Sequence, residues 1–196
     1  MNNIFCIVGK SGSGKDTLYK IIAQNYGSTL IPVIPYTTRP KRDDEIHGGN
    51  YYFVNDEQMQ AYENANQIIE KRQYHTMWGI WSYFTLKFSI DASKDYILIT
   101  TLDGAKALIK HYGSQTVHVV YLHVDDRNRL LRCIERETLQ SHPNYSEVCR
   151  RFIADQNDFS EEQLRQFDSL HKIDTQLPIE VCMQDWKRIY EKSQRI

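Results

Sequence analysis

The sequence has no long apolar run. Its apolar stretches are short, as at 96–99, and none approaches the roughly 20 residues that a helix needs to cross a bilayer. Residues 1–8 carry no basic segment ahead of their brief apolar stretch, which predicts a first β-strand and not a signal peptide. We therefore expect a cytoplasmic protein with no membrane partner.

The chain also lacks an excess of charge and is poor in cysteine. Its 24 basic and 25 acidic residues give a formal net charge of -1, so we expect no nucleic-acid partner. The four cysteines have no metal-clip spacing, and we expect reduced, mostly structural thiols at Cys6, Cys133, Cys149 and Cys182. With 196 residues and no internal repeat, the chain is long enough for one α/β domain with a sizeable core.

Strand-like and helix-like patterns alternate outside residues 36–86. This alternation predicts a mainly parallel sheet with helices on both of its faces. The expected strands are 4–8, 30–34, 96–100, 117–124 and 169–173, and the expected helices are 16–25, 103–112, 126–137, 146–159 and 179–192.

The stretch 36–86 breaks this alternation because it is rich in turn-forming and β-prone residues. A helix is expected at 56–64, with Asn55 as its cap, and strands at 67–76 and 81–86 could pair. This stretch is the candidate for a small inserted, β-rich, substrate-binding subdomain.

A glycine-rich loop joins the first predicted strand to the first predicted helix. Glycine permits a path along which consecutive backbone N–H groups surround an anionic oxygen, and the helix N-terminus adds partial positive charge. Lys15 could then reach the β- and γ-phosphates of ATP. The alternative is an ordinary glycine-rich turn with Asp16 at the helix start. The predicted phosphate-binding residues are Gly9, Ser11, Gly12, Ser13, Gly14, Lys15, Asp16 and Thr17.

Asp16 occupies the position where such loops usually have a hydroxyl that binds Mg²⁺. A carboxylate is a hard oxygen ligand and could bind Mg²⁺ directly or through water. It also places negative charge near the phosphates, which is unfavourable unless a cation lies between them. We therefore expect Mg²⁺, together with ATP, as the cofactor, and Asp16 as its ligand.

Two further segments follow the loop: Pro35-Tyr36-Thr37-Thr38-Arg39-Pro40-Lys41-Arg42 and Gly48-Gly49-Asn50-Tyr51-Tyr52-Phe53-Val54. In this order and spacing they resemble the guanylate kinase family, and the resemblance covers most of the chain. It implies a phosphate-loop nucleoside monophosphate kinase fold in a single domain at 1–196. The implied parts are a core at 1–34 and 87–196, an acceptor-binding subdomain at 35–86 and a helical lid at 126–151.

The resemblance implies transfer of the γ-phosphate of Mg·ATP to GMP or dGMP, giving GDP or dGDP. Arg39, Arg42 and Tyr51 would hold the acceptor phosphate through charge-assisted hydrogen bonds. The alternative is that the two arginines form solvated surface pairs with Asp43, Asp44 and Glu45.

Glu70 lies where the family places its guanine-binding carboxylate. A carboxylate only accepts hydrogen bonds, which suits the adjacent N1–H and N2–H₂ donors of guanine. Tyr83 and Thr85 would contact the phosphate and the base respectively. They match the family only across an insertion that includes Met77 and Trp78.

Lid arginines are implied at Arg132, Arg136 and Arg151, where they would neutralise charge on the transferring phosphoryl group. Lys15 and Arg39 complete the implied catalytic set. The remaining charges of the arginine-rich helix are expected to be solvated: Asp126, Arg127, Arg129, Glu135 and Glu137.

The chain departs from the family pattern at Pro35, which replaces a small polar residue, and at Ile99 and Thr101, which replace two aspartates; Asp103 is out of register. Two other functions therefore stay open. Ribose bisphosphate phosphokinases resemble guanylate kinases, and some share the Gly-Lys-Asp loop ending and a Tyr-x-Thr-Arg-Pro segment. Guanylate-kinase-like binding modules are non-catalytic, but they typically have a degraded phosphate loop.

Overall fold

The computed structural model describes residues 2–42, 45–76, 79–91 and 93–194. Asp43, Asp44, Met77 and Trp78 lie outside the described residues. In the described part of the chain, the helices are too short or too polar to cross a bilayer.

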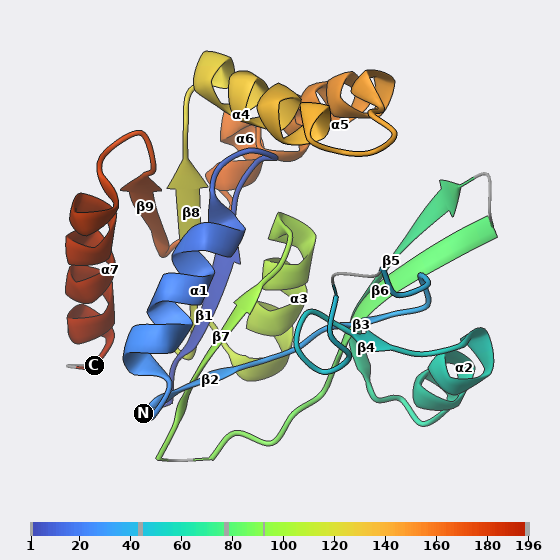
Figure 1. Ribbon diagram of the computed structural model, residues 1–196. Helices are drawn as coiled ribbons and strands as arrows, with labels where there is room; N and C mark the ends of the chain where they lie inside the picture. The colour runs from blue at the N-terminus through green and yellow to red at the C-terminus, as the bar shows by residue number, and fades with distance from the viewer. Residues whose placement is uncertain (1, 43–44, 77–78, 92, 195–196) are drawn as a thin grey trace.

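A five-stranded parallel sheet forms the centre of the molecule (Figure 1). Strands that run parallel need long crossover connections, and helices supply most of them here. The sheet confirms the predicted α/β fold. In spatial order its strands are β2 (Leu30–Pro32), β7 (Asp95–Ile99), β1 (Ile4–Val8), β8 (Val117–His123) and β9 (Leu170–Asp174).

Helices cover both faces of this sheet, as predicted. Successive side chains of a strand point to opposite faces, so Ile4 and Cys6 of β1 enter different packing layers from Phe5 and Ile7. The first layer contains residues of α3 (Leu102–Tyr112) and, at its margin, α6 (Glu161–Leu164). The second contains residues of α1 (Lys15–Tyr26) and α7 (Ile179–Ser193).

The carboxyl ends of the parallel strands meet at one edge of the sheet. Strand β1 leads there into the glycine-rich loop, and β8 leads into α4 (Asp126–Thr138). The side chain of Asp125 accepts a hydrogen bond from the backbone N–H of Asn128 and thereby caps α4. In Figure 1, α4 and α5 (Tyr145–Asp158) lie beyond this edge.

A second sheet contains the predicted strand pair, β5 (Ile68–Thr76) and β6 (Gly79–Leu86), which is antiparallel. Strands β3 (Tyr36–Thr37) and β4 (Tyr52–Phe53) complete it, in the order β4-β3-β6-β5. Helix α2 (Asp56–Asn64) begins at Asn55, which forms a capping box with Gln58. This confirms the predicted cap. The limits of the subdomain, 35–86, stay a prediction.

Aromatic rings join α2 to one face of the second sheet. The ring of Tyr36 lies 4.7 Å from that of Tyr52 and 5.4 Å from that of Phe84, measured between centroids. Tyr62 of α2 packs edge-on against Tyr36 at 5.5 Å. Because side chains alternate along a strand, Glu70 lies on the opposite face of the second sheet and takes no part in this packing.

The cysteines are free thiols, as predicted. Cys6, Cys133 and Cys182 are buried, whereas Cys149 is exposed on α5. Burial raises the pKa of the Cys6 thiol, so it stays protonated and packs as a small apolar side chain.

A buried polar cluster lies at the opposite edge of the central sheet from the loop. The backbone and side-chain N–H groups of Asn3 donate to Asp95 Oδ1 over 2.8 and 3.1 Å. His118 Nε2 lies 2.8 Å from Asn3 Oδ1 and donates to it as the neutral Nε2–H tautomer. Burial lowers the pKa of His118, His171 lowers it further, and Asp95 opposes the shift.

We expect the free energy of unfolding to fall as the pH drops below the ordinary histidine pKa of 6.5. There the unfolded state binds a proton that folded His118, with its lowered pKa, does not bind. H118Q keeps an N–H donor within reach of Asn3 but does not titrate. Between about pH 7.5 and about pH 5.5, its unfolding free energy should therefore change less than that of the wild type.

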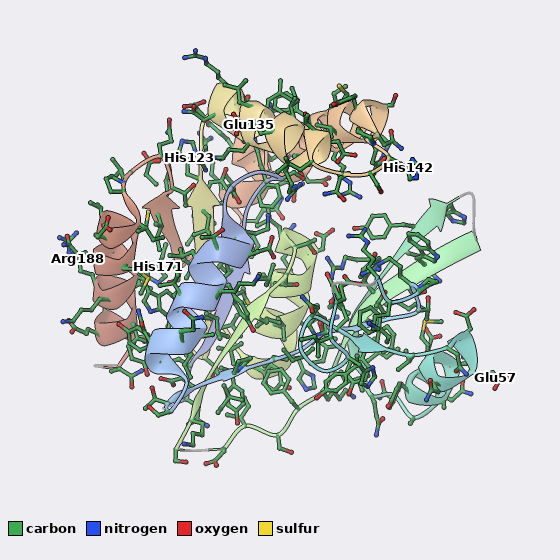
Figure 2. The ribbon with its side chains drawn as sticks, in the orientation of Figure 1. Glu57, His123, Glu135, His142, His171 and Arg188 are labelled. Atoms are coloured by element: carbon green, nitrogen blue, oxygen red, sulfur yellow. The ribbon has the colours of Figure 1, made fainter. Side chains whose placement is uncertain are left out.

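Denaturant unfolding at both pH values measures this difference. H142Q is the matched control, because His142 lies exposed on the connection between α4 and α5 (Figure 2). An H118Q variant whose stability varies with pH as steeply as that of the wild type would contradict the prediction.

Candidate active site

The glycine-rich loop can form only because two of its residues adopt left-handed backbone angles. Gly12 has φ 79° and Gly14 has φ 80°. At Gly12 there is a second constraint, because a Cβ atom would lie 2.5 Å from the carbonyl oxygen of Arg129 and 2.9 Å from Cys133 Sγ. The loop is therefore in direct backbone contact with α4, and only glycine fits there.

Lys15 lies at the start of α1 with its ammonium group turned back onto the loop. Its Nζ donates to the carbonyl oxygens of Gly9 at 2.6 Å and Lys10 at 3.0 Å. Burial lowers the pKa of Lys15, the charges of Asp16 and Asp155 raise it, and that of Arg136 lowers it. The ammonium is thus held by carbonyl dipoles that an incoming phosphate could replace.

A cavity of about 330 Å³ lies over the loop. The structure brings together here side chains that are far apart in the sequence, from the loop, α4 and α5. All three implied lid arginines reach it. The lining residues are Ser11, Gly12, Gly14, Lys15, Asp16, Thr17, Arg132, Arg136 and Arg151.

Two of the lid arginines are already bonded within the protein. Arg132 donates to the carbonyl oxygen of Thr175 at 2.9 Å and, more weakly, to that of Gly12 at 3.4 Å. Arg151 Nε donates to Glu147 Oε1 at 2.7 Å. The hydrogen bond from Arg150, followed by that from Arg151, lowers the pKa of Glu147 to about 2, so this carboxylate is ionised at neutral pH.

A second cavity of about 250 Å³ adjoins the first. Gly14, Thr17 and Arg132 line both. Its other lining side chains are mostly apolar and come from α1 and from the segment after β9: Leu18, Thr175, Leu177, Ile179 and Cys182.

Arg39 is the centre of the predicted acceptor-phosphate site. It is only 4% exposed, and its Nε donates to Tyr83 Oη at 3.1 Å while Nη2 pairs with Glu45 Oε1 at 2.6 Å. Burial alone would lower the pKa of Arg39, but the contacts with Glu45 and Tyr83 raise it. The alternative of a solvated surface pair is therefore wrong for Arg39, which is paired but buried. Arg42 is exposed.

Apart from Arg42, the other predicted acceptor residues form a continuous row with Arg39. The rings of Tyr51 and Tyr83 pack edge to face at 5.6 Å. Glu70 accepts a hydrogen bond from Thr85 Oγ1 at 2.9 Å, across the β5–β6 pair. Between these two contacts lies Arg72, whose Nε is 3.1 Å from Glu70 Oε2 and whose cross-strand neighbour is Tyr83.

Electrostatic coupling links this row to the phosphate loop. Burial raises the pKa of Tyr51; the charges of Arg72 and Arg39 lower it, and that of Asp16 raises it. The loop carboxylate therefore acts on an acceptor-site phenol. Asp16 of the loop and Tyr51 of the row are close enough for their charges to interact.

The end of β7 supplies no carboxylate to the loop cavity. Thr101 accepts a hydrogen bond from Gly104 N and caps α3, and Ile99 packs against the second core layer. The side chain of Asp103 is 88% exposed and pairs with Lys106. Within the described ranges, no three His, Cys, Asp or Glu side chains are grouped closely enough to hold a metal ion. Asp16 is the carboxylate that the loop itself contributes to the cavity.

The structural roles of three charged groups near the sites were not anticipated from the sequence. Arg129, expected to be solvated, is fully buried and pairs with Asp126 and Asp155; that expectation was wrong. Asp155 also accepts the backbone N–H of Ser11 at 2.7 Å, so it joins α5 to the loop. Arg72 was also missed, although residues two apart on a strand share a face, which places it beside Glu70.

A strand–loop–helix unit, a parallel sheet and a cation-lined cavity at its carboxyl edge define a phosphate-loop protein of the α/β class. Within that class the chain belongs to the guanylate kinase family, because the model of the family Guanylate kinase matches residues 1–175.

Individual relatives agree with this assignment. The chain is 33% identical to the guanylate kinase of Rhodopirellula baltica over 132 residues, which are 64% of this chain and 62% of that protein. It is 29% identical to the guanylate kinase of Thermotoga maritima over 133 residues, covering 66% of this chain and 63% of that protein. The chain thus spans a little over three fifths of the length of these relatives.

The fold is similar to that of a solved structure, the guanylate kinase from Anaplasma phagocytophilum. The TM-score is 0.68 at 15% sequence identity, with 98% of this chain and 86% of that chain covered.

Alanine at the two left-handed glycines of the loop separates two costs. Backbone strain arises at both positions, whereas steric overlap with α4 arises at Gly12 only. For G14A we expect a loss of about 1–2 kcal/mol in unfolding free energy from the backbone angle alone, because nothing lies within 4 Å of the added Cβ. G12A adds overlap with the backbone of α4 and should lose about 1–3 kcal/mol more. Denaturant unfolding measures both, and equal losses would mean that the contact between the loop and α4 is not tight.

Proposed function

We propose that this protein transfers the γ-phosphoryl group of Mg·ATP to GMP or dGMP, giving GDP or dGDP. The observation that carries the proposal is the loop cavity, in which Lys15 and three arginines from the lid helices converge. Tyr51 of the acceptor row on the second sheet lies close enough to Asp16 of that cavity for their charges to interact.

The loop and its neighbouring cavity suit ATP. The phosphates would lie against the backbone N–H groups of the loop, where Lys15 would exchange its carbonyl partners for phosphate oxygens. The adjoining, mostly apolar cavity offers Leu18, Leu177 and Ile179 to a flat heterocycle. Arg132 lies between the two cavities and would contact the phosphates from there.

The second sheet suits a nucleoside monophosphate. Arg39, Arg42, Tyr51 and Tyr83 would hold its phosphate, since guanidinium groups and phenols donate charge-assisted hydrogen bonds. At the other end of the row, Glu70 and Thr85 would take the Watson–Crick edge of guanine.

Mg²⁺ fits the residues present. It is usually held by one or two carboxylates together with substrate phosphates and water, and Asp16 provides one carboxylate in the loop cavity. When bound, the ion would neutralise phosphate charge. The protein supplies position and positive charge: an oxygen of the acceptor phosphate attacks the γ-phosphorus, the β–γ bridging bond breaks, and Arg136 and Arg151 offset the developing charge. We place this reaction in the cytoplasm.

K15A should lower kcat by on the order of a hundredfold or more, because it removes a charge that follows the phosphoryl group into the transition state. Its folding should be little affected, since the Nζ partners are two loop carbonyl groups. Coupled assays of turnover and thermal unfolding test the two parts separately. A folded K15A enzyme with near-normal kcat would remove the loop from the mechanism.

A panel of GMP, dGMP, AMP and UMP assayed with Mg·ATP tests the proposed acceptor, and E70Q tests how it is bound. The amide turns one acceptor oxygen into a donor that faces a guanine donor. An unpaired buried group costs about 1–3 kcal/mol, so kcat/KM for GMP should fall roughly ten- to a hundredfold. ATP affinity should stay unchanged because ATP binds at the loop.

The matched control is E63Q, because Glu63 pairs with Lys71 on the outer side of the second sheet. A wild-type enzyme without preference for guanine would overturn the assignment of the acceptor. Equal losses with GMP and AMP in E70Q would overturn the role of Glu70 alone.

A further inference from the structure

Arg72 makes the closest charged contact of Glu70. Both residues lie on β5 and face the same side, and their cross-strand neighbours on β6 are Tyr83 and Thr85. Arg72 Nε lies 3.1 Å from Glu70 Oε2, and Nη2 donates to Glu70 Oε1 at 3.4 Å. The side chain of Glu70 is only 6% exposed, so its oxygens have few alternative partners.

The guanidinium group of arginine and the Watson–Crick edge of guanine present the same pattern to a carboxylate. Each offers two adjacent, roughly parallel N–H donors. Glu70 Oε1 already accepts from Thr85 as well as from Arg72. A guanine that approaches Glu70 with both donors therefore competes with Arg72 for the same oxygens.

We propose that Arg72 is a specificity-determining residue of the acceptor site: it occupies Glu70 in the empty site and must give way to the guanine edge. This inference rests on the proposed function, because it takes Glu70 to be the guanine-binding carboxylate. It makes Arg72 an internal competitor that weakens the discrimination of guanine from bases that do not use Glu70.

The contact has the properties of one that can open. Arg72 Nε makes no hydrogen bond of good geometry with the described residues, although it lies close to Glu70. The side chain of Arg72 is 26% exposed, and its charge also acts on the Tyr51 phenol. The guanidinium can therefore leave Glu70 and remain in a polar environment.

The loss of guanine affinity depends on the fraction of sites in which Arg72 is paired with Glu70. A ligand that binds only the open form loses affinity in proportion to the fraction of open sites. Partly exposed ion pairs shift such equilibria by up to about fivefold. Removal of Arg72 should therefore tighten guanine binding by about two- to fivefold relative to adenine binding.

The experiment measures dissociation constants for GMP and AMP without ATP, and kcat/KM with Mg·ATP, in the wild type, R72M and K71M. Methionine keeps the length of the arginine stem but has no donor. K71M removes the same charge from the adjacent residue, which pairs with Glu63 on the opposite face. Any contribution of Arg72 to phosphate binding affects GMP and AMP alike and cancels in the ratio.

R72M should raise the preference for GMP over AMP by about two- to fivefold, and K71M should leave it as in the wild type. A preference that stays constant or falls in R72M would overturn the inference, because Arg72 would then be neutral or would assist guanine binding. If GMP is turned over and the preference stays constant, the inference alone fails. If GMP is not turned over, the proposed reaction fails, and the binding constants still test the contact: a GMP-over-AMP binding preference that R72M raises would show that Arg72 competes with guanine for Glu70, and an unchanged one would overturn that as well.

Discussion

The rest of the structure depends on the parallel pairing of β1 with its two neighbours. Strand β7 lies along one side of β1 and β8 along the other. This pairing fixes the points at which the glycine-rich loop, the cap of α3 and the start of α4 leave the sheet. Because Gly12 touches the backbone of Arg129, the distance from the loop to α4 is then set by backbone atoms. The cavity over the loop is the space left by these constraints.

A buried charge reinforces this arrangement. Arg129 has no exposed surface, and its guanidinium group lies 3.7 Å from the centre of the Phe152 ring while pairing with Asp126 and Asp155. Removal of both carboxylates would leave an uncompensated buried charge, a situation that costs about 3–5 kcal/mol or more. Since Asp155 also holds the backbone of Ser11, the loop, α4 and α5 form one connected polar unit.

Local patterns were sufficient to predict most of the fold. The helix at 56–64 and its cap at Asn55 follow from short-range spacing, as does the strand that leads into the loop. Strand β3 and helix α6 were not anticipated, because elements of two and four residues are too short to show a period. The burial of Arg129 depends on Asp155, which is distant in sequence, and a helix rich in charge gives no sign of it. The spacing along the strand places Arg72 on the same face as Glu70. Whether Arg72 binds that carboxylate or extends into solvent depends on how deeply this part of the strand is buried, which the sequence does not indicate.

Three cationic groups of the two sites are already partnered by the protein itself: Lys15 by carbonyl oxygens, Arg39 by Glu45, and Arg151 by Glu147. Under the proposed function, a nucleotide would exchange these partners for its own phosphate oxygens. Few counterions would be released on binding, so nucleotide affinity should depend on ionic strength less steeply than the number of arginines suggests. Under the proposed function, the same exchange would leave Glu45 and Glu147 without their partners, and repulsion between these carboxylates and the phosphates would weaken the binding of substrates and products alike.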